Sequence, residues 1–419
     1  MIRERRLAAP AYSPGQQVSV ELPKDAVYHQ LMLELDGQFT TVYPAGSSGT
    51  TVGTRFSPGF PFNLISKLRL VRNGSDTVWQ GSGKQLAKES LALNSRYPFA
   101  RMWFDSGTTG ANGTAYALLT KSINGMTIPS NSEGIGSNSA TFSETPTGSS
   151  TTIVNFRCML EMWLQLGVSD NFFTTLLDAR PLASFILEIT WANITDFCLV
   201  GSYLGGAGTL TQTVNCSIQS YDQDNIQLGV PFGTFKRASF NPPGLAFSSS
   251  QVQALLPRGN LYYGILIETL GFKSSGLATI AEPGNDILGE IQNRINSNYL
   301  LRDVYFRDLQ AKNRNDGLIP SNSFEPWGAG PLGWAFMYYP CTGDSIKELV
   351  GTYQFDQFDL LLNINSTTGT GSSLSDGNTY NGTPVINLLT QEVIPGRSVG
   401  SGARGAFAGS ISSTTAKPG

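Results

Sequence analysis

Residues 155–164, NFRCMLEMWL, decide the fold class, because apolar and polar side chains alternate along the whole stretch. The apolar series is Phe156, Cys158, Leu160, Met162 and Leu164. Successive side chains of a strand point to opposite faces of its sheet, so a strand with one buried face shows this period of two. The pattern predicts a β-strand over 153–165.

The same alternation recurs along most of the chain. Each further segment is bounded by Gly, Pro, Asn, Asp or Ser, as strand ends usually are. The segments are 27–35, 64–72, 183–191, 261–269, 332–339 and 355–364. The chain is therefore expected to be all-β with a few short helices.

Four segments favour helix. Residues 84–95 and 300–313 place apolar side chains at helical spacing. Two shorter segments, 170–179 and 344–350, resemble single-turn connectors, and Ser345 with Glu348 in the second makes a capping-box pattern.

These elements follow one order twice: helix, strand, short helix, strand. The later strands repeat at an offset of about 172 residues, which is too long for a small solenoid repeat. The order predicts two copies of one β-domain. The expected boundaries are an N-terminal arm at 1–14, a first domain at 15–228, a second at 229–396 and a flexible Gly/Ser-rich C-terminal arm at 397–419.

The two copies differ by an insertion at about 104–151. It is rich in Gly, Ser, Thr and Asn and has few large apolar residues, so it cannot form a core of its own. The insertion is expected on the surface, either as a disordered loop or as a projecting structured one.

The stretch 73–90, NGSDTVWQGSGKQLAKES, raises the question of a phosphate-binding loop. That motif needs a glycine where Val78 stands and a Ser or Thr where Gln85 follows Lys84. The favoured interpretation is structural: a hairpin turning at Asn73-Gly74 or Ser75-Asp76, and glycines 81–83 at the corner before a helix.

No residue pattern indicates an active site. The single histidine, His29, lies in a strand pattern without a local partner, and the cysteines Cys158, Cys198, Cys216 and Cys341 form no CxxC pair. Two carboxylate pairs lie beside turns or strand ends, where solvated Asp is common; they are Asp222 with Asp224 and Asp356 with Asp359. We expect no catalytic, cofactor-binding or metal-binding residues, no cofactor and no enzymatic activity.

The charge content is low. Only 14% of residues are charged and the formal net charge is -3, so nothing indicates specific nucleic-acid recognition. A lightly charged polar surface suits wide contact with further copies. At the N-terminus Arg3, Arg5 and Arg6 form a locally basic group, which is a candidate contact with phosphates at a membrane or with neighbouring subunits. No apolar run approaches the ~20 residues that span a bilayer, and no secretion signal is present, so synthesis in a host cytoplasm is expected.

The chain resembles the double jelly-roll major capsid proteins of tectivirus-like, membrane-containing icosahedral viruses, including bacteriophages. Four stretches carry the resemblance: NLISKLRLVRNGSDTVWQGSGKQL, NCSIQSYDQDNIQLGV, the long segment NDILGEIQNRINSNYLLRDVYFRDLQAKNRNDGLIP, and VGTYQFDQFDLLLNIN. It spans about residues 15–395 and rests on the order of elements together with loose local similarity.

The resemblance implies two tandem eight-stranded jelly-roll β-sandwiches. It also implies a coat subunit that self-assembles as pseudo-hexagonal homotrimers in an icosahedral virion shell over an internal lipid membrane. The implied partners are neighbouring capsomers, vertex (penton) proteins and minor capsid proteins, with Arg3, Arg5 and Arg6 facing inward. The alternative is a β-sandwich carbohydrate-binding or depolymerising protein, such as a phage tail or secreted protein, with exposed aromatic side chains and a carboxylate pair in one cleft.

Overall fold

The structure is a computed structural model and describes most of the predicted strands and helices. The described residues are 2–43, 52–56, 59–94, 99–106, 140–144, 150–166, 175–200, 209–224, 233–247, 251–273, 281–316, 333–339, 349–365 and 380–395. The predicted C-terminal arm, most of the insertion and Cys341 lie outside them.

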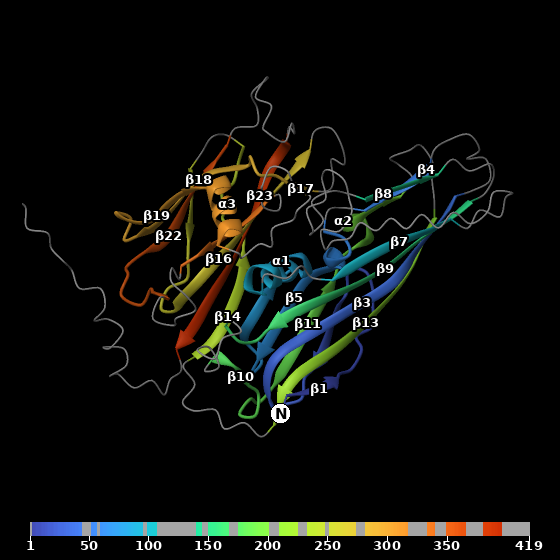
Figure 1. The fold of residues 1–419 in the computed structure, drawn as a ribbon, viewed down its shortest axis with the longest axis horizontal. Helices are drawn as coiled ribbons and strands as arrows, with labels where there is room; N and C mark the ends of the chain where they lie inside the picture. Colours follow the sequence, from blue (N-terminus) through green and yellow to red (C-terminus); the bar gives the residue numbers. More distant parts are fainter. Residues whose placement is uncertain are drawn as a thin grey trace, which may run out of the picture.

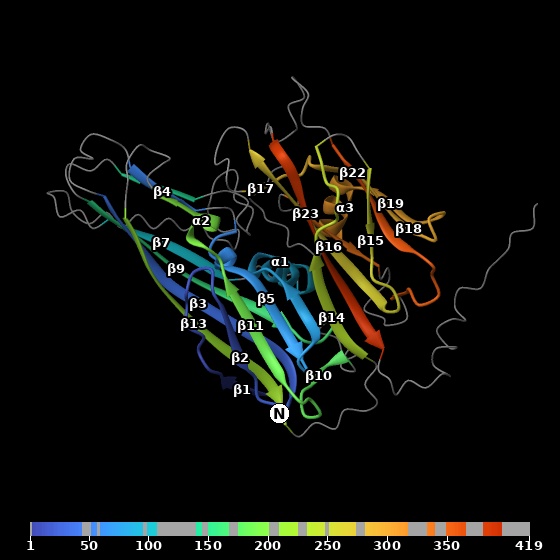
Figure 2. The ribbon, with the colours of Figure 1, turned by 180° about the vertical axis from the view of Figure 1, so that it is seen from behind.

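The N-terminal half forms two facing sheets (Figure 1). One has the order β1-β13-β3-β9-β7, with β10 also paired to β3; its strands are β1 (Arg3–Arg6), β3 (Val27–Tyr43), β7 (Ala100–Ser106), β9 (Ser150–Trp163), β10 (Leu177–Asp178) and β13 (Thr209–Gln223). The other has the order β6-β5-β11-β2; its strands are β2 (Gln17–Glu21), β5 (Ile65–Arg72), β6 (Asp76–Gly81) and β11 (Phe185–Trp191). Figure 2 shows β11 and β2 beside β5 from behind.

The C-terminal half repeats this arrangement. One sheet has the order β19-β18-β22-β15, built from β15 (Gln251–Leu255), β18 (Leu288–Ile295), β19 (Tyr299–Tyr305) and β22 (Phe358–Ile364). The other has the order β14-β23-β16, with further strands along β16; its strands are β14 (Gly233–Phe240), β16 (Leu261–Lys273), β17 (Ala281–Pro283), β20 (Trp334–Tyr338), β21 (Val350–Gly351) and β23 (Tyr380–Pro395). The order β6-β5-β11-β2 thus reappears as β19-β18-β22-β15, and β1-β13-β3-β9 reappears as β14-β23-β16-β20.

Two hairpins show how closely the halves agree. In the β5–β6 hairpin Arg72 faces Asp76, and the register shifts after Val71 faces Thr77. In β18–β19 Ile295 faces Tyr299, and the register shifts at the same place, after Arg294 faces Leu300. Both turns begin at an asparagine with positive φ, 51° at Asn73 and 52° at Asn296, and each hairpin leads into a helix. The two hairpins are therefore equivalent residue by residue.

A buried tyrosine marks the start of the long strand in each half. The Tyr28 hydroxyl donates to the Pro23 carbonyl at 2.6 Å, and the Tyr262 hydroxyl donates to the Pro257 carbonyl at 2.8 Å. Each ring packs edge-on against a phenylalanine, with centroids 5.1 Å apart for Tyr28–Phe185 and 4.9 Å for Tyr262–Phe358. Tyr28 and Tyr262 are thus equivalent positions, and the predicted duplication of one β-domain is present in detail.

The helices correct part of the sequence analysis. Helix α1 spans Gly83–Asn94, close to the expected 84–95. Helix α3 spans only Phe306–Asn315, so the helix expected at 300–313 is wrong over its first residues, which form β19. The spacing of their apolar residues fits a helix. However, the turn after Ile295 brings the chain back antiparallel to β18, and the backbone hydrogen bonds between β18 and β19 outweigh the helix propensity of these residues.

The two short helices expected from the sequence fall largely outside the described residues. Where 170–179 is described, Leu177–Asp178 form strand β10 paired to β3, so that expectation is wrong there. Where 344–350 is described, Val350 belongs to β21. Leu177 and Asp178 pair with β3 and Val350 pairs with β16, which satisfies backbone groups of these residues without a helix.

The insertion is strand at its described ends. Ala140–Glu144 form β8, which pairs with β4 (Val52–Phe56), and β4 pairs with β12 (Cys198–Val200). This small sheet lies at one end of the long strands β3 and β13 (Figure 1). A four-residue helix α2 (Ile194–Phe197), with a capping box of Asn193 and Asp196, leads into β12, and a 3-10 turn (Phe62–Leu64) leads into β5.

Apolar side chains fill the space between the sheets of each half. Strand β9 confirms the alternation read from the sequence, since Phe156, Cys158 and Leu160 are each fully buried. One cluster of buried residues lies within the C-terminal half. The other fills the N-terminal half and continues across the boundary into Phe235 and Phe336. The two halves therefore share a buried contact.

Candidate functional site at the junction of the two halves

The glycine-rich corner begins a helix that lies between the halves. Ser82 caps α1: its hydroxyl accepts from the Gln85 amide at 3.2 Å, and the Gln85 side-chain oxygen accepts from the Ser82 amide at 2.9 Å. A Cβ added to Gly83 would lie 2.3 Å from the Phe62 carbonyl oxygen, so only glycine fits this close approach. The corner is thus filled by the protein itself.

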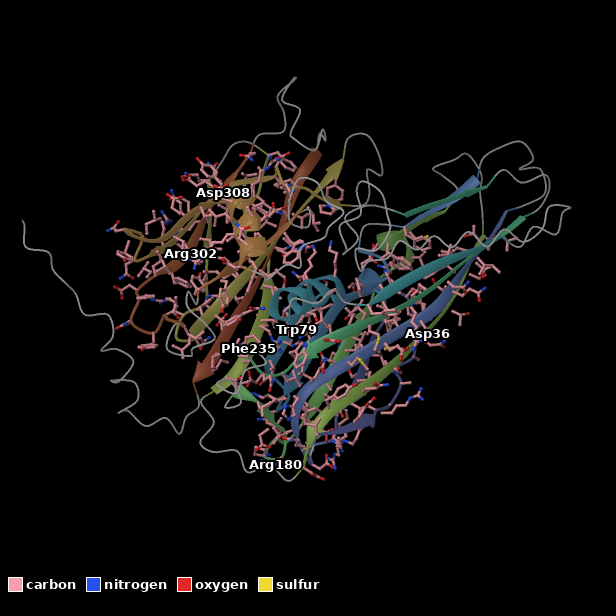
Figure 3. The ribbon with its side chains drawn as sticks, viewed as in Figure 1. Asp36, Trp79, Arg180, Phe235, Arg302 and Asp308 are labelled. Atoms are coloured by element: carbon pink, nitrogen blue, oxygen red, sulfur yellow. The ribbon has the colours of Figure 1, made fainter. Side chains whose placement is uncertain are left out.

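Helix α1 is buried almost all round despite its polar sequence. Gln85, Lys88 and Glu89 expose 3%, 2% and 1% of their surface, although such side chains are rarely buried unless paired. Figure 3 shows Trp79 beside the helix and Phe235 on the neighbouring strand of the other half. Each of these three buried α1 side chains has a partner in the C-terminal half: Gln85 bonds to Ser239, Lys88 to Glu268 and Glu89 to Gln391.

Glu268 of β16 receives the two lysines of α1. Its Oε1 lies 2.5 Å from Lys88 Nζ and 3.0 Å from Lys84 Nζ, and its Oε2 accepts from Asn387 Nδ2 at 2.8 Å. Burial by itself raises the pKa of the Glu268 carboxyl, but the two lysine charges outweigh it and hold the pKa well below its usual range. Glu268 is therefore ionised at neutral pH.

Glu89 of α1 is the second centre of the junction. Its carboxylate accepts from Trp79 Nε1 at 2.7 Å and from Gln391 Nε2 of β23 at 2.9 Å, and it lies 3.6 Å from Arg237 Nη1 of β14. The Arg237 guanidinium also stacks 4.3 Å from the centre of the Phe235 ring, and its burial lowers its pKa. One α1 carboxylate thus joins three strands.

The backbone closes the same junction. Strand β14 pairs in parallel with β6, with Arg237 opposite Trp79 and Ala238 opposite Gln80, which merges the β6 sheet and the β14 sheet into one. Removing one partner of a buried ion pair leaves an unpaired charge and is strongly destabilising, so such pairs favour one arrangement over others. The geometry holds the two like halves in a single relative position.

The N-terminal arginines lie in strand β1 and not in a loose arm. Arg3 Nε and Arg5 Nε donate to the two oxygens of the fully buried Asp222 at 2.6 and 2.8 Å. Both also pair with Asp25, and Arg3 pairs with Asp224 at 2.8 Å. Arg6 is exposed on the other face of the strand. The sequence did not reveal this pairing, because Asp222 and Asp224 lie more than 200 residues from the arginines along the chain.

The remaining candidate residues have structural surroundings. His29 Nε2 lies 3.1 Å from Gln223 Oε1 on the neighbouring strand. Asp356 is exposed, whereas Asp359 is buried and accepts from Arg294 Nε at 2.9 Å. The structure brings neither carboxylate pair into a shared reactive arrangement.

The described cysteines are all buried. Cys158, Cys198 and Cys216 are free thiols, and burial raises the pKa of Cys198 and of Cys216 to about 12. Among the described residues no group of three His, Cys, Asp or Glu side chains is arranged to hold a metal ion, and none of the helices there could span a bilayer.

The sequence did not predict the contacts between α1 and the C-terminal half. Lys84, Lys88 and Glu89 are polar residues of the predicted helix 84–95, and nothing in the helix sequence indicates that they are buried. One signal could have found them: Glu268 is an acid inside the apolar run ILIETLGF, and an acid in a buried strand requires a cation nearby.

Comparison with known proteins supports the architecture. No protein-family model and no curated protein sequence matches the chain. The structure is similar to a crystal structure described as that of the STIV MCP. The TM-score is 0.57 and the sequence identity is 16%, over 94% of this chain and 97% of that chain. A chain in the atomic structure of Sulfolobus turreted icosahedral virus gives 0.54 and 16% over 94% and 91%. The faustovirus major capsid protein gives 0.50 and 8% over 94% and 90%.

These likenesses extend over nearly the whole of each chain and show the fold. The chain is a double jelly roll, as the repeated strand order indicates, and the expected all-β class is confirmed.

Proposed function

We propose that the chain is the major coat subunit of an icosahedral virus, a structural protein and not an enzyme. The observation that carries the proposal is the junction of α1 with β14, β16 and β23. Buried ion pairs at this junction fix two equivalent jelly rolls side by side. A coat subunit built in this way presents two similar contact surfaces to neighbouring subunits. The resemblance in fold to the faustovirus major capsid protein supports this reading.

The assembly we propose is a homotrimer with six similar jelly rolls in a ring. Neighbouring trimers, vertex proteins and minor capsid proteins would complete the shell. We propose the division at 229, supported by the repeat, in which β14 starts the second set of strands just as β1 starts the first. We include β1 in the first jelly roll and not in an arm.

We further propose that the shell encloses a lipid membrane, as in the tectivirus-like viruses. The support is the resemblance to those viruses, because in this chain Arg3 and Arg5 are bound in ion pairs with Asp222. Flotation of the wild-type protein with vesicles containing anionic lipid tests this part. Binding that weakens as the salt concentration rises is expected, and the absence of flotation at low salt contradicts it.

The decisive experiment for the coat is expression of the chain followed by electron microscopy, together with glycan binding and hydrolysis assays. Capsomers or shell-like particles without glycan activity are expected. A monomer that binds or cleaves glycans would instead establish the alternative, a carbohydrate-binding or depolymerising protein.

A further inference from the structure

The two helices of the repeat differ in one respect. The second, third, sixth and seventh residues of α1 are Lys84, Gln85, Lys88 and Glu89, and the C-terminal half covers them. The same positions of α3 are Arg307, Asp308, Ala311 and Lys312, and all four are exposed. The face that α1 uses to bind the next jelly roll is therefore uncovered on α3.

The surface that receives α1 also has an uncovered counterpart. Glu268 lies six residues after Tyr262, and Glu34 lies six residues after the equivalent Tyr28. Around Glu268 the sheet is covered by α1, whereas Glu34 pairs with Arg157 of β9 and lines a surface hollow of about 540 Å³ with Asp36, Asn155, Arg157 and others. In Figure 3 Asp36 and Asp308 lie on opposite sides of the molecule.

Strand β1 extends this counterpart surface. Arg237 of β14 faces Gln391 and Ser239 faces Leu389, while Glu4 of β1 faces Tyr221 and Arg6 faces Gln219. Gln391 and Tyr221 occupy the same place, since each precedes the residue opposite Tyr262 or Tyr28. Glu4 is thus equivalent to Arg237, and Arg6 to Ser239, and both are exposed.

We propose that α3 of one chain docks on β1 and the Glu34 hollow of a second copy, repeating the contact that α1 makes within the chain. The inference rests on the proposed coat function and names its subunit seam. Three of the internal contacts then have a charged external counterpart, whereas Lys88–Glu268 has none because Ala311 occupies the position of Lys88 on α3. Lys84–Glu268 becomes Arg307 with Glu34 of the second copy. The Gln85–Ser239 bond, in which Gln85 Nε2 donates to the Ser239 hydroxyl at 2.7 Å, becomes Asp308 with Arg6. Glu89–Arg237 becomes Lys312 with Glu4.

Charge complementarity argues for this occupant. All three external pairs join opposite charges, and in the third the signs are reversed relative to the internal pair, with the acid now on the strand and the base on the helix. Arg307 and Lys312 expose 48% and 53% of their side chains, so they can reach a neighbour while keeping local contacts with Asp286 and Asp316.

Strand β19 supplies apolar surface beside this face. Tyr299 and Tyr305 are 65% and 60% exposed, and β19 is an edge of its sheet, whereas its counterpart β6 is covered by β14. Because the helix face and the receiving face are different surfaces of one chain, the contact is head-to-tail and builds a ring when its rotation closes. If the junction within each chain and the junction between chains have the same geometry and alternate, they produce a ring of similar jelly rolls.

The test exchanges one charge pair. Glu4→Lys and Lys312→Glu are each expected to raise the concentration at which half of the oligomer dissociates by about tenfold or more, because like charges then face each other. The double variant restores opposite charges in every seam and is expected to return to within about threefold of wild type. Analytical ultracentrifugation measures all four proteins.

Matched controls carry the same charge changes on the outer face of the β6-β5-β11-β2 sheet. Glu21→Lys and Lys67→Glu lie at exposed positions outside the seam and are expected to associate like wild type. If the wild type is oligomeric and both single seam variants associate like these controls, the seam is overturned while the coat function stands. If the wild type stays monomeric at every concentration and shows no assembly, the coat function itself fails and the seam falls with it.

Discussion

Lys88 and Glu268 are 180 residues apart in the sequence, yet their side chains meet at 2.5 Å with both residues almost fully buried. The pair joins helix α1 of the first jelly roll to strand β16 of the second. Two charges removed from water are stable only together, and a second cation, Lys84, adds to the pair.

Replacing Glu268 by Gln is expected to lower the free energy of unfolding by about 3–5 kcal/mol, because Lys88 is then buried without a counter-charge. Urea unfolding followed by tryptophan fluorescence measures the loss. The double variant Lys88→Met with Glu268→Met removes both charges and should recover most of the stability. Equal losses in the single and the double variant would show that the charges themselves contribute little.

The lowered pKa of Glu268 also indicates how the stability of the fold should change with pH. The folded-state pKa of Glu268 is lowered, so its contribution to stability is complete above the unfolded value of about 4.3 and is lost as the pH falls toward the folded value. Wild-type stability should therefore fall more steeply than that of Glu268→Gln between about pH 5 and pH 2. Parallel stability curves for the two proteins over that range would contradict the assigned ionisation.

The sequence predicts the strands well where one face is buried, as in β9 and β11, because alternation reports burial directly. It fails at β19, where the edge strand has few buried positions and its apolar residues fit a helix equally well. The short repeat LPKDAVY and LPRGNLY, which holds Tyr28 and Tyr262, was visible in the sequence and marks the duplication better than the helices do. The junction could not be predicted in full, because the partners of Lys88 and Glu89 are set by how the two halves meet.

Gly83→Ala should destabilise the protein by about 1–3 kcal/mol, because the new methyl group would overlap the Phe62 carbonyl oxygen at the start of α1. The matched variant is Gly74→Asn in the β5–β6 turn. Gly74 has a φ of 77° and open space around its Cα, and asparagine tolerates that conformation, so a small effect is expected there. Thermal unfolding compares the two, and equal shifts would argue against the close approach at Gly83.

Asp222→Asn should loosen the N-terminal strand, since Asp222 is buried and holds both Arg3 and Arg5. We expect a loss of about 3 kcal/mol and faster hydrogen exchange of the β1 amides. Asp224→Asn removes a single ion pair at a half-exposed position and should cost less than about 1 kcal/mol. Unchanged exchange of β1 in Asp222→Asn would mean that backbone pairing alone holds the strand.

We expect two equivalent jelly rolls in each chain to build a ring of six jelly rolls from three chains. Electron-microscopic class averages of the purified wild-type capsomer, at a measured mass near three times 45.1 kDa, test it most directly. We expect a hexagonal outline with three-fold symmetry, in which the junctions within a chain and those between chains look alike. A two-lobed particle at the mass of one chain, or a ring whose external junctions do not involve the α3 face, would contradict it.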